Sequence, residues 1–155
     1  MSTFLPLCVR IDGRPILFVG GGALAMHKLQ AVLRFDADVT VLAPGVDDEV
    51  RRSGARLLLK AYEPSDLEGF FLVYACSEDG ELNRRVLADA EARGVLCNIV
   101  DNREDSSFIS PALFRHDAMT VAVSSDGRNA RRSVEWRNAI REFLLERERS
   151  STSNT

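Results

Sequence analysis

A glycine cluster between an apolar run and a helical pattern is the feature that most constrains how this chain folds. Residues 16–19 are apolar at every position, residues 20–22 are all glycine, and apolar residues then recur at helical spacing up to residue 35. A short run without polar positions is typical of a strand that is buried on both faces of a parallel sheet. The cluster therefore predicts a strand, a tight turn and a helix that packs back onto the sheet.

The same alternation of strand and helix patterns continues along the chain. The clearest later helix ends at Gly94, in the position of a helix C-cap. Alternation at this spacing predicts right-handed βαβ units, and hence an α/β protein with a Rossmann-type, mostly parallel sheet that carries helices on both faces. Besides the first strand, we expect extended segments at residues 5–11, 39–42, 57–61, 70–76, 95–100 and 119–123.

A long C-terminal helix follows, for which Asn129 is a suitable N-cap residue. This helix carries an apolar stripe that we interpret as a packing or dimer face, formed by Trp136, Ile140, Phe143 and Leu144. The chain thus divides into a Rossmann domain at residues 1–113, a strand plus long helix at 114–149, and a polar tail at 150–155 that we expect to be disordered.

Composition narrows the class of protein. The 155 residues allow one domain with an appendage, 45% of them are apolar, and no apolar run approaches the ~18 residues of a membrane span. Cys8, Cys76 and Cys97 lie in apolar surroundings and form no CxxC pair, so we expect buried thiols and a cytoplasmic protein. Two histidines far apart in the sequence do not supply a preformed zinc site, and we expect no bound metal.

Gly20, Gly22 and Ala25 occupy the three positions of a dinucleotide-binding GxGxxG/A motif. The first glycine permits a tight turn, the second lets the backbone approach a pyrophosphate, and the small third residue lets the helix pack on the strand. Free amide groups at the start of the helix then face the phosphates. Glycine-rich turns also occur for packing alone, but between a strand and a helix we interpret this motif as a dinucleotide site.

The second strand lacks the acidic residue that commonly holds the adenine ribose at its end. Ala43, Pro44 and Gly45 stand there instead, so we expect backbone groups to hold the ribose. Because no arginine lies beside them to receive a 2′-phosphate, we expect NAD rather than NADP. We interpret Asp47 and Asp48, slightly later in the chain, as acids at a helix N-terminus rather than as ribose ligands.

Six short motifs in a fixed order extend this argument over residues 4 to about 127. They are GGGALA at 20–25 followed by Lys28, VTVLAP at 39–44, YACSED at 74–79 followed by Leu82 and Asn83, CNIVD at 97–101, FISPA at 108–112 and VAVSSDG at 121–127. Together they resemble the N-terminal dehydrogenase module of siroheme synthases and the stand-alone precorrin-2 dehydrogenases. After Gly127 the chain departs from the family pattern and reads RNARRS.

The resemblance implies oxidation of precorrin-2 to sirohydrochlorin with hydride transfer to NAD+, and in some relatives insertion of ferrous iron at the same site. It also implies that Asp101 corresponds to the catalytic aspartate. Because only one helix follows Gly127, we expect a dehydrogenase without efficient iron insertion. The cofactor residues that the resemblance implies are Gly20, Gly21, Gly22, Ala23, Leu24, Ala43, Pro44 and Gly45, to which we add Ser77 from the YACSED motif.

Asp101 follows the apolar strand at residues 95–100, so we expect it at a carboxyl end of the sheet, where open α/β folds bind ligands. Loss of hydride from a reduced macrocycle leaves a cation that must lose a proton, and a carboxylate near the nicotinamide suits that step. The residue type alone leaves a second reading, in which the aspartate only begins a turn.

Arginine accounts for 18 of the 20 basic residues and clusters toward the C-terminus. Residues 127–141 contain five arginines against one acid, which suits a ligand with many carboxylates such as precorrin-2. A solvated helix face is the alternative, and acids farther along the helix argue against nucleic acid. We read His116 as a solvated loop histidine. The candidate substrate residues are Arg103, Arg115, Ser124, Ser125, Arg128 and Arg131.

One helix is a thin cover for a large macrocycle, so we expect two chains to form a homodimer and share the site. We expect neither a nucleic acid nor a membrane as partner. Two other functions stay open, namely a regulatory Rossmann domain that senses NAD and signals through its terminal helix, and an interaction protein whose glycine loop is only structural. Cofactor binding and tetrapyrrole turnover separate the three.

Overall fold

The computed structural model describes residues 2–100 and 102–152, and the chain forms two compact units. The first is Leu7–Phe108, and the second combines Ser2–Pro6 with the chain from Ile109 onward. This division falls five residues before the boundary predicted after residue 113, because the strand that begins at Ala112 pairs outside the main sheet.

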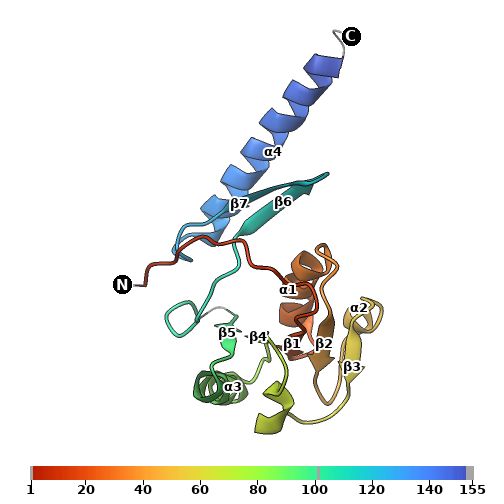
Figure 1. The fold of residues 1–155 in the computed structure, drawn as a ribbon, viewed down its shortest axis with the longest axis vertical. Coiled ribbons are helices and arrows are strands. Elements are labelled where there is room, and N and C mark those ends of the chain that lie inside the picture. Colours follow the sequence, from red (N-terminus) through yellow and green to blue (C-terminus); the bar gives the residue numbers. More distant parts are fainter. Residues whose placement is uncertain (1, 101, 153–155) are drawn as a thin grey trace. The chain divides into compact units, whose positions relative to one another are not determined.

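A five-stranded parallel sheet forms the centre of the first unit, in the order β3-β2-β1-β4-β5. The strand before the glycine cluster, β1, lies in the middle between β2 and β4 (Figure 1). This arrangement confirms the predicted Rossmann-type sheet. The strands are β1 (Ile16–Val19), β2 (Val39–Leu42), β3 (Arg56–Leu58), β4 (Leu72–Ala75) and β5 (Leu96–Ile99).

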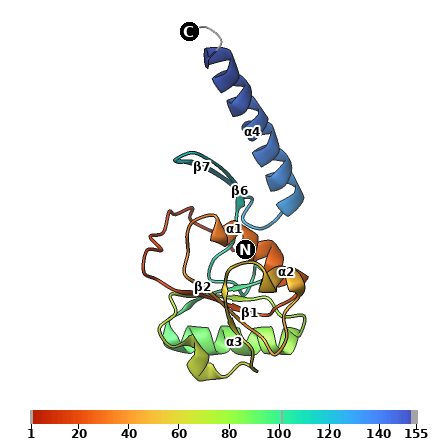
Figure 2. The same cartoon turned by 90° about the vertical axis from the view of Figure 1, so that its right-hand side faces the viewer.

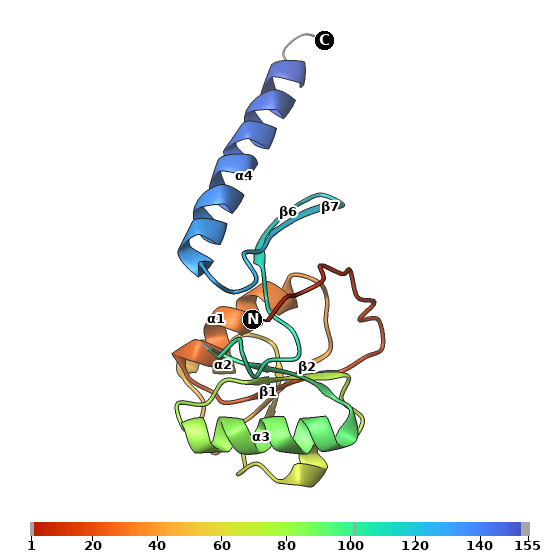
Figure 3. The same cartoon turned by 90° about the vertical axis from the view of Figure 1, so that its left-hand side faces the viewer.

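Helices cover both faces of this sheet, as predicted (Figures 2 and 3). On one face lie α1 (Ala23–Leu33) and the short α2 (Asp48–Arg51). On the other lie α3 (Gly80–Arg93) and the 3-10 helix η1 (Pro64–Leu67). The sequence pattern did not indicate η1, because four residues are too few to show a helical period.

The central strand β1 shows why its residues are all apolar. Leu17 and Val19 are buried in the core cluster that includes residues of α3, whereas Ile16 and Phe18 are buried in the cluster that includes residues of α1. Phe18 also stacks on Tyr74 of β4, with 4.5 Å between ring centroids. Since helices cover both faces, no position of this strand meets solvent, and a polar residue would be buried at either face.

Local end signals determine where α3 begins and ends. Asp79, at the N-cap, accepts hydrogen bonds from the backbone N–H groups of Glu81 at 2.9 Å and Leu82 at 3.2 Å. At the other end Gly94 adopts a left-handed backbone with a φ of 67°, which confirms the predicted C-cap. The loop at residues 76–79 between β4 and α3 is therefore short and opens at the carboxyl edge of the sheet.

Two of the predicted strands do not belong to the parallel sheet. Residues 5–11 form no strand, and no ladder of the described residues includes them. Residues 119–123 do form a strand, β7 (Met119–Val123), but it pairs antiparallel with β6 (Ala112–His116) in a separate two-stranded sheet. The sequence analysis missed β6, whose backbone partners come from a strand only a few residues later, so that hairpin closure replaces a crossover to the main sheet.

The regular elements of the second unit are the β6–β7 hairpin and the long helix α4 (Ala130–Thr152), which lie side by side (Figure 1). Arg137 of α4 donates a hydrogen bond from Nη1 to the carbonyl of Leu113 at 2.8 Å, and the Arg141 guanidinium lies over the Phe114 ring. Within the described residues, no helix combines the length and the apolar character that a membrane span requires.

Side chains at both ends explain the length of α4. Asn129 caps the start as predicted, since its Oδ1 accepts a hydrogen bond from the Arg132 N–H at 2.9 Å. The helix continues to Thr152, so the tail predicted from residue 150 begins too early. Ser150 and Ser151 fit the last turn because their hydroxyls donate to carbonyls four residues back, each at 2.9 Å. Residues 153–155 of that predicted tail lie outside the described residues.

The predictions for single cysteine and histidine residues are only partly right. Cys76 and Cys97 are buried as expected, whereas Cys8 is exposed in the segment before β1, where no core covers it. His116 was predicted on a loop but is the last residue of β6, and its Nε2 lies 3.0 Å from a carboxylate oxygen of Glu148.

Candidate functional site

A cavity of about 310 Å³ opens at the carboxyl ends of the parallel strands. This edge of an open α/β sheet is where ligands bind. The walls come from the loops after β1, β2 and β4, from Tyr62, and from Leu82 at the start of α3. The glycine cluster therefore lies at the cavity, as its motif predicts.

Gly20 permits a close approach of two loops. Its φ is 130°, which residues with a side chain rarely adopt, and a Cβ there would lie 2.5 Å from the carbonyl oxygen of Cys76. Its N–H donates to the carbonyl of Leu42 at 3.0 Å. The fold itself requires glycine at this position, before any ligand is considered.

Gly21 and Gly22 are glycine for different reasons. A Cβ on Gly21 would lie 2.6 Å from the carbonyl oxygen of Gly45, so packing between the loops excludes any side chain there. A Cβ on Gly22 would meet nothing closer than 3.8 Å, and the φ of −98° is open to all residues, so no neighbour requires glycine. The missing side chain leaves its space to the cavity, and this fits a pyrophosphate held against the amides that begin α1.

The loop after β4 is held by a reciprocal pair of hydrogen bonds between Ser77 and Asn83 of α3. The Ser77 N–H donates to Asn83 Oδ1 at 3.0 Å, and Asn83 Nδ2 donates to the Ser77 carbonyl at 2.8 Å. Ser77 Oγ in turn accepts from the Asp79 N–H at 3.1 Å. Asn83 is buried, so these bonds are shielded from water and fix the backbone at the cavity wall.

Two carboxylates flank Gly22 at the cavity. Asp47 Oδ2 and Glu78 Oε1 each lie 3.8 Å from the position of a Cβ on that glycine. The sequence analysis interpreted Asp47 as an acid at a helix N-terminus and did not single out Glu78; both in fact line the cavity. Asp47 comes just after the Ala43–Pro44–Gly45 turn, which is the one sequence signal that could have placed it there. Within residues 2–100 and 102–152, no group of three or more His, Cys, Asp or Glu side chains could hold a metal ion.

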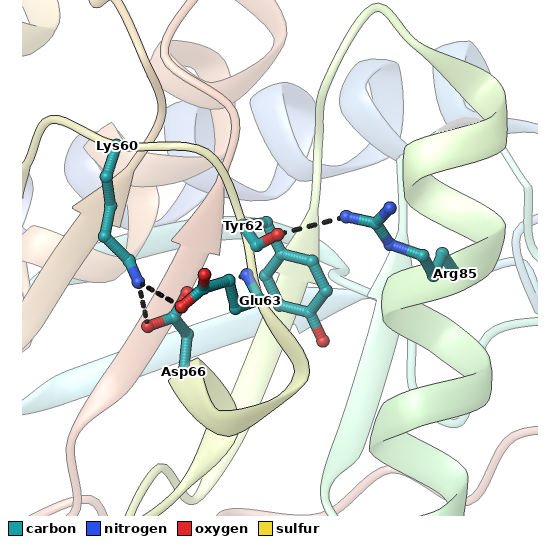
Figure 4. A network of polar contacts seen from close by, with 5 residues as sticks. All are labelled: Lys60, Tyr62, Glu63, Asp66 and Arg85. Atoms are coloured by element: carbon teal, nitrogen blue, oxygen red, sulfur yellow. Dashed lines mark hydrogen bonds and ion pairs between the residues drawn. The ribbon is translucent and has the colours of Figure 1, made fainter.

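Tyr62 also lines the cavity, and no sequence pattern pointed to it. Its hydroxyl donates to Asp89 at 3.0 Å, and burial together with this bond raises the pKa of the phenol well above its usual range. Arg85 donates from Nη2 to the Tyr62 carbonyl at 3.0 Å and lies over the ring (Figure 4). Tyr62 is thus a neutral, fixed wall of the cavity.

The segment before Tyr62 is held by an exposed ion network. Lys60 Nζ lies 3.1 Å from Glu63 and 2.9 Å from Asp66 (Figure 4), and its hydrogen bond to Asp66 raises the pKa of the lysine. Beyond Tyr62 a second cavity, of about 560 Å³, shares Pro44, Tyr62 and Leu82 with the first.

Most of the predicted cofactor residues line the first cavity. Ala23 and Leu24 do not, because they are the first two residues of α1 and follow the part of the loop that borders the cavity. Ala25 is fully buried, as expected for the small residue that packs helix on strand. The predicted residues that line the cavity are Gly20, Gly21, Gly22, Ala43, Pro44, Gly45 and Ser77.

The candidate base Asp101 lies outside the described residues, but hydrogen bonds tie the chain on either side of it to β5. Ser106 Oγ accepts from the Ile99 N–H at 3.0 Å and donates to the Asn102 carbonyl at 2.6 Å. The buried Ser106 therefore closes the turn after β5. Arg103, a candidate substrate residue, forms an ion pair with Glu104 at 2.9 Å.

The other candidate substrate residues belong to the second unit. Ser125 Oγ accepts from the Asn129 N–H at 2.9 Å and so stabilises the turn that leads into α4. Arg131 Nε pairs with Glu135, one helical turn later, at 3.1 Å. These candidates are Arg115 in β6, Ser124 and Ser125 directly after β7, Arg128 in the turn before α4, and Arg131 in the first turn of α4.

Comparisons with known proteins cover most of the chain. A protein-family model described as "Putative NAD(P)-binding" matches residues 7–112, which include the whole parallel sheet and both cavities. The solved structure of "SirC, precorrin-2 dehydrogenase" has a TM-score of 0.76 and 25% sequence identity, over 93% of this chain and 70% of that one.

Similar curated proteins carry the name siroheme synthase. The siroheme synthase of Chromobacterium violaceum and siroheme synthase 1 of Cronobacter sakazakii are each 40% identical to this chain over 128 residues. Each alignment covers 80% of this chain and 27% of the relative. The chain therefore spans about a quarter of the length of the curated relatives that it matches.

Proposed function

The chain belongs to the NAD(P)-binding family, among the siroheme synthase N-terminal modules and precorrin-2 dehydrogenases, and from this premise we propose that it oxidises precorrin-2 to sirohydrochlorin. When bound, NAD+ supplies the hydride acceptor. The observation that carries the proposal is the cavity at the carboxyl edge of the sheet, where Gly22 leaves open the space beside the start of α1.

The cofactor is held mainly by backbone groups in this proposal. The loop at residues 20–22 and the first turn of α1 bind the pyrophosphate, for which the free amides and the helix dipole are suited. Residues 43–45 border the adenine ribose, and no arginine stands among them to bind a 2′-phosphate, which supports NAD rather than NADP. Ser77, fixed by Asn83, bounds the cavity on the side of β4.

Asp101 is the general base of this proposal. Loss of hydride leaves the macrocycle as a cation, and neutrality returns when a ring carbon loses a proton to the Asp101 carboxylate. In the sequence this aspartate comes two residues after the last residue of β5. Ser106 ties Ile99 to Asn102, which follows this aspartate in the sequence.

The arginine-rich second unit supplies the contacts to the carboxylates of precorrin-2, and a second copy of the chain completes the cover. Arg131 is suited to this task because its side chain is 91% exposed. The exposed rings of Trp136 and Phe143 on α4 support a homodimer in which this stripe is buried. The free thiols of Cys76 and Cys97 support a cytoplasmic location.

The proposal is tested by following sirohydrochlorin formation from precorrin-2 and NAD+ in the absorption spectrum, with and without ferrous iron as second substrate. We expect turnover, and we expect Asp101→Asn to lower kcat by at least about a hundredfold, the lower range for a lost general base. Asp12→Asn, the same chemical change in an exposed residue far from Asp101 in the sequence, is the matched control and retains activity. An Asp101→Asn enzyme of normal rate contradicts the base assignment, and a wild-type protein without turnover contradicts the function.

A further inference from the structure

The loop between β2 and α2 places the carboxylate of Asp47 at the cavity, where it forms no contact that stabilises the fold of the described residues. Asp47 occupies the N-cap position of α2, yet its side chain makes no capping hydrogen bond. Across residues 2–100 and 102–152, its carboxylate takes part in no hydrogen bond or ion pair with another described side chain. Both oxygens are therefore available to a ligand.

The glycine loop itself holds Asp47 in place. The Asp47 N–H donates to the Gly21 carbonyl at 2.8 Å, and the approach of Gly21 to Gly45 leaves no room for a side chain between the two loops. The carboxylate lies beside Gly22, with Oδ2 3.8 Å from where a Cβ would be. Asp47 is thus tied to the same loop that the proposed function assigns to the pyrophosphate.

We propose that Asp47 binds the two hydroxyls of the adenine ribose and makes this site prefer NAD+ over NADP+. The inference rests on the proposed function, because it takes the cavity as a dinucleotide site. An ionised carboxylate accepts two hydrogen bonds, which matches the two donors of a vicinal diol. A 2′-phosphate replaces one donor by a group of the same charge as the carboxylate, so the hydrogen bond is lost and repulsion is added.

The assignment accounts for a gap in the sequence motif. The acid that usually follows the second strand is missing from residues 43–45, but the chain turns at Pro44 and carries Asp47 back to the cavity. A Cβ on Gly45 would have no neighbour within 4 Å, and residues 42–45 line the cavity together with Asp47. Asp47, a few residues later in the chain, therefore takes the role of the acid that usually follows the second strand.

Glu78, the other acid beside Gly22, is the alternative ligand for the adenine ribose. Its position in the sheet order distinguishes it from Asp47. It follows β4, on the opposite side of β1 from β2. The adenine ribose in a Rossmann fold lies at the end of the second strand, so Asp47 is on the ribose side and Glu78 is not.

The test is calorimetric titration of the full chain with NAD+, with NADP+ and with an NAD+ analogue that lacks the 2′-hydroxyl of the adenine ribose. For the wild type we expect the tightest binding with NAD+. Asp47→Asn and Asp47→Ser should each lower the preference for NAD+ over NADP+ by about tenfold or more, the range of a charge-assisted hydrogen bond. The serine variant keeps a good N-cap residue for α2 and guards against a folding defect in the first variant.

The deoxy analogue makes the test specific to the hydroxyl. In the wild type it should bind more weakly than NAD+, and in Asp47→Asn, whose amide oxygen accepts only a neutral hydrogen bond, this difference in affinity should be smaller. Asp48→Asn, an exposed neighbour that does not line the cavity, is the control and should leave the preference unchanged. An unchanged preference in both Asp47 variants, or a loss of preference in Glu78→Gln, overturns the assignment alone. A wild type that binds neither nucleotide overturns the proposed function as well.

Discussion

The three glycines after β1 meet three different physical needs, although the sequence motif names only the first and the last. Gly20 has a backbone that few other residues adopt, and Gly21 packs directly against the loop after β2. Only Gly22 has free space at its side chain position, and that space belongs to the cavity. The motif identifies residue types in a pattern, whereas the positions of the neighbours tell which glycine serves the fold and which serves a ligand.

This difference predicts opposite outcomes for two equivalent substitutions. Gly20→Ala should lower the free energy of unfolding by more than about 2 kcal/mol, because its Cβ would lie 2.5 Å from a carbonyl oxygen at a positive φ. Gly22→Ala should stay within about 1 kcal/mol of the wild type and weaken NAD+ binding by about tenfold or more. Urea denaturation and calorimetric titration measure the two effects. A Gly22→Ala protein that is as stable as the wild type and binds NAD+ equally well contradicts the assignment of this space to the cofactor.

At the scale of helices and strands, signals within a few residues predicted the helix ends well. Gly94 and Asn129 act as the caps that the sequence predicted, and the structure adds Asp79 as the N-cap of α3. Strand partners were less predictable, because the apolar pattern at residues 119–123 is the same for a strand in the main sheet and for one in a hairpin. The pairing of β7 with β6 depends on a turn at Asp117. The sequence pattern did not predict the positive φ of 50° that this residue adopts.

The apolar stripe of α4 yields a prediction about assembly. Trp136 and Phe143 are 57% and 55% exposed, so burial between two copies would remove apolar surface from water. We expect a dimer at micromolar concentration in sedimentation equilibrium, and a monomer for Phe143→Glu, which places a charge in the stripe. Asn138→Glu puts the same charge about half a helical turn away from Trp136, on the opposite face, and should remain dimeric. A wild-type monomer that turns over precorrin-2 contradicts the shared site.

For the whole molecule, the buried thiols predict how stability depends on pH. Burial raises the pKa of Cys76 and Cys97 from an ordinary value of 9.0 to about 12. Below pH 9 both thiols are protonated in the folded and the unfolded chain, and their contribution to stability is complete. As the pH rises from there toward the folded values, only the unfolded chain releases protons, so the free energy of unfolding falls by up to about 1.4 kcal/mol per pH unit for each thiol.

Urea denaturation followed by circular dichroism at several pH values above neutrality measures this loss. Replacing both buried thiols by alanine should make the decline above pH 9 shallower. Cys8→Ala is the matched control and should leave the decline unchanged, because Cys8 is exposed. A decline of equal steepness in the double variant contradicts the role of the buried thiols.

The sequence by itself determined the five strands of the main sheet, the helix after the glycine loop, and the caps Gly94 and Asn129, because each depends on residues within a turn or two of one another. Only the tertiary structure decided which segments leave the main sheet and which side chains meet at the cavity. Asp47, Tyr62 and Glu78 come from three separate loops, and their approach to Gly22 or to its cavity depends on strand order and loop packing. Such long-range contacts leave no period in the local sequence, and so the sequence pattern did not place the Asp47 carboxylate beside Gly22.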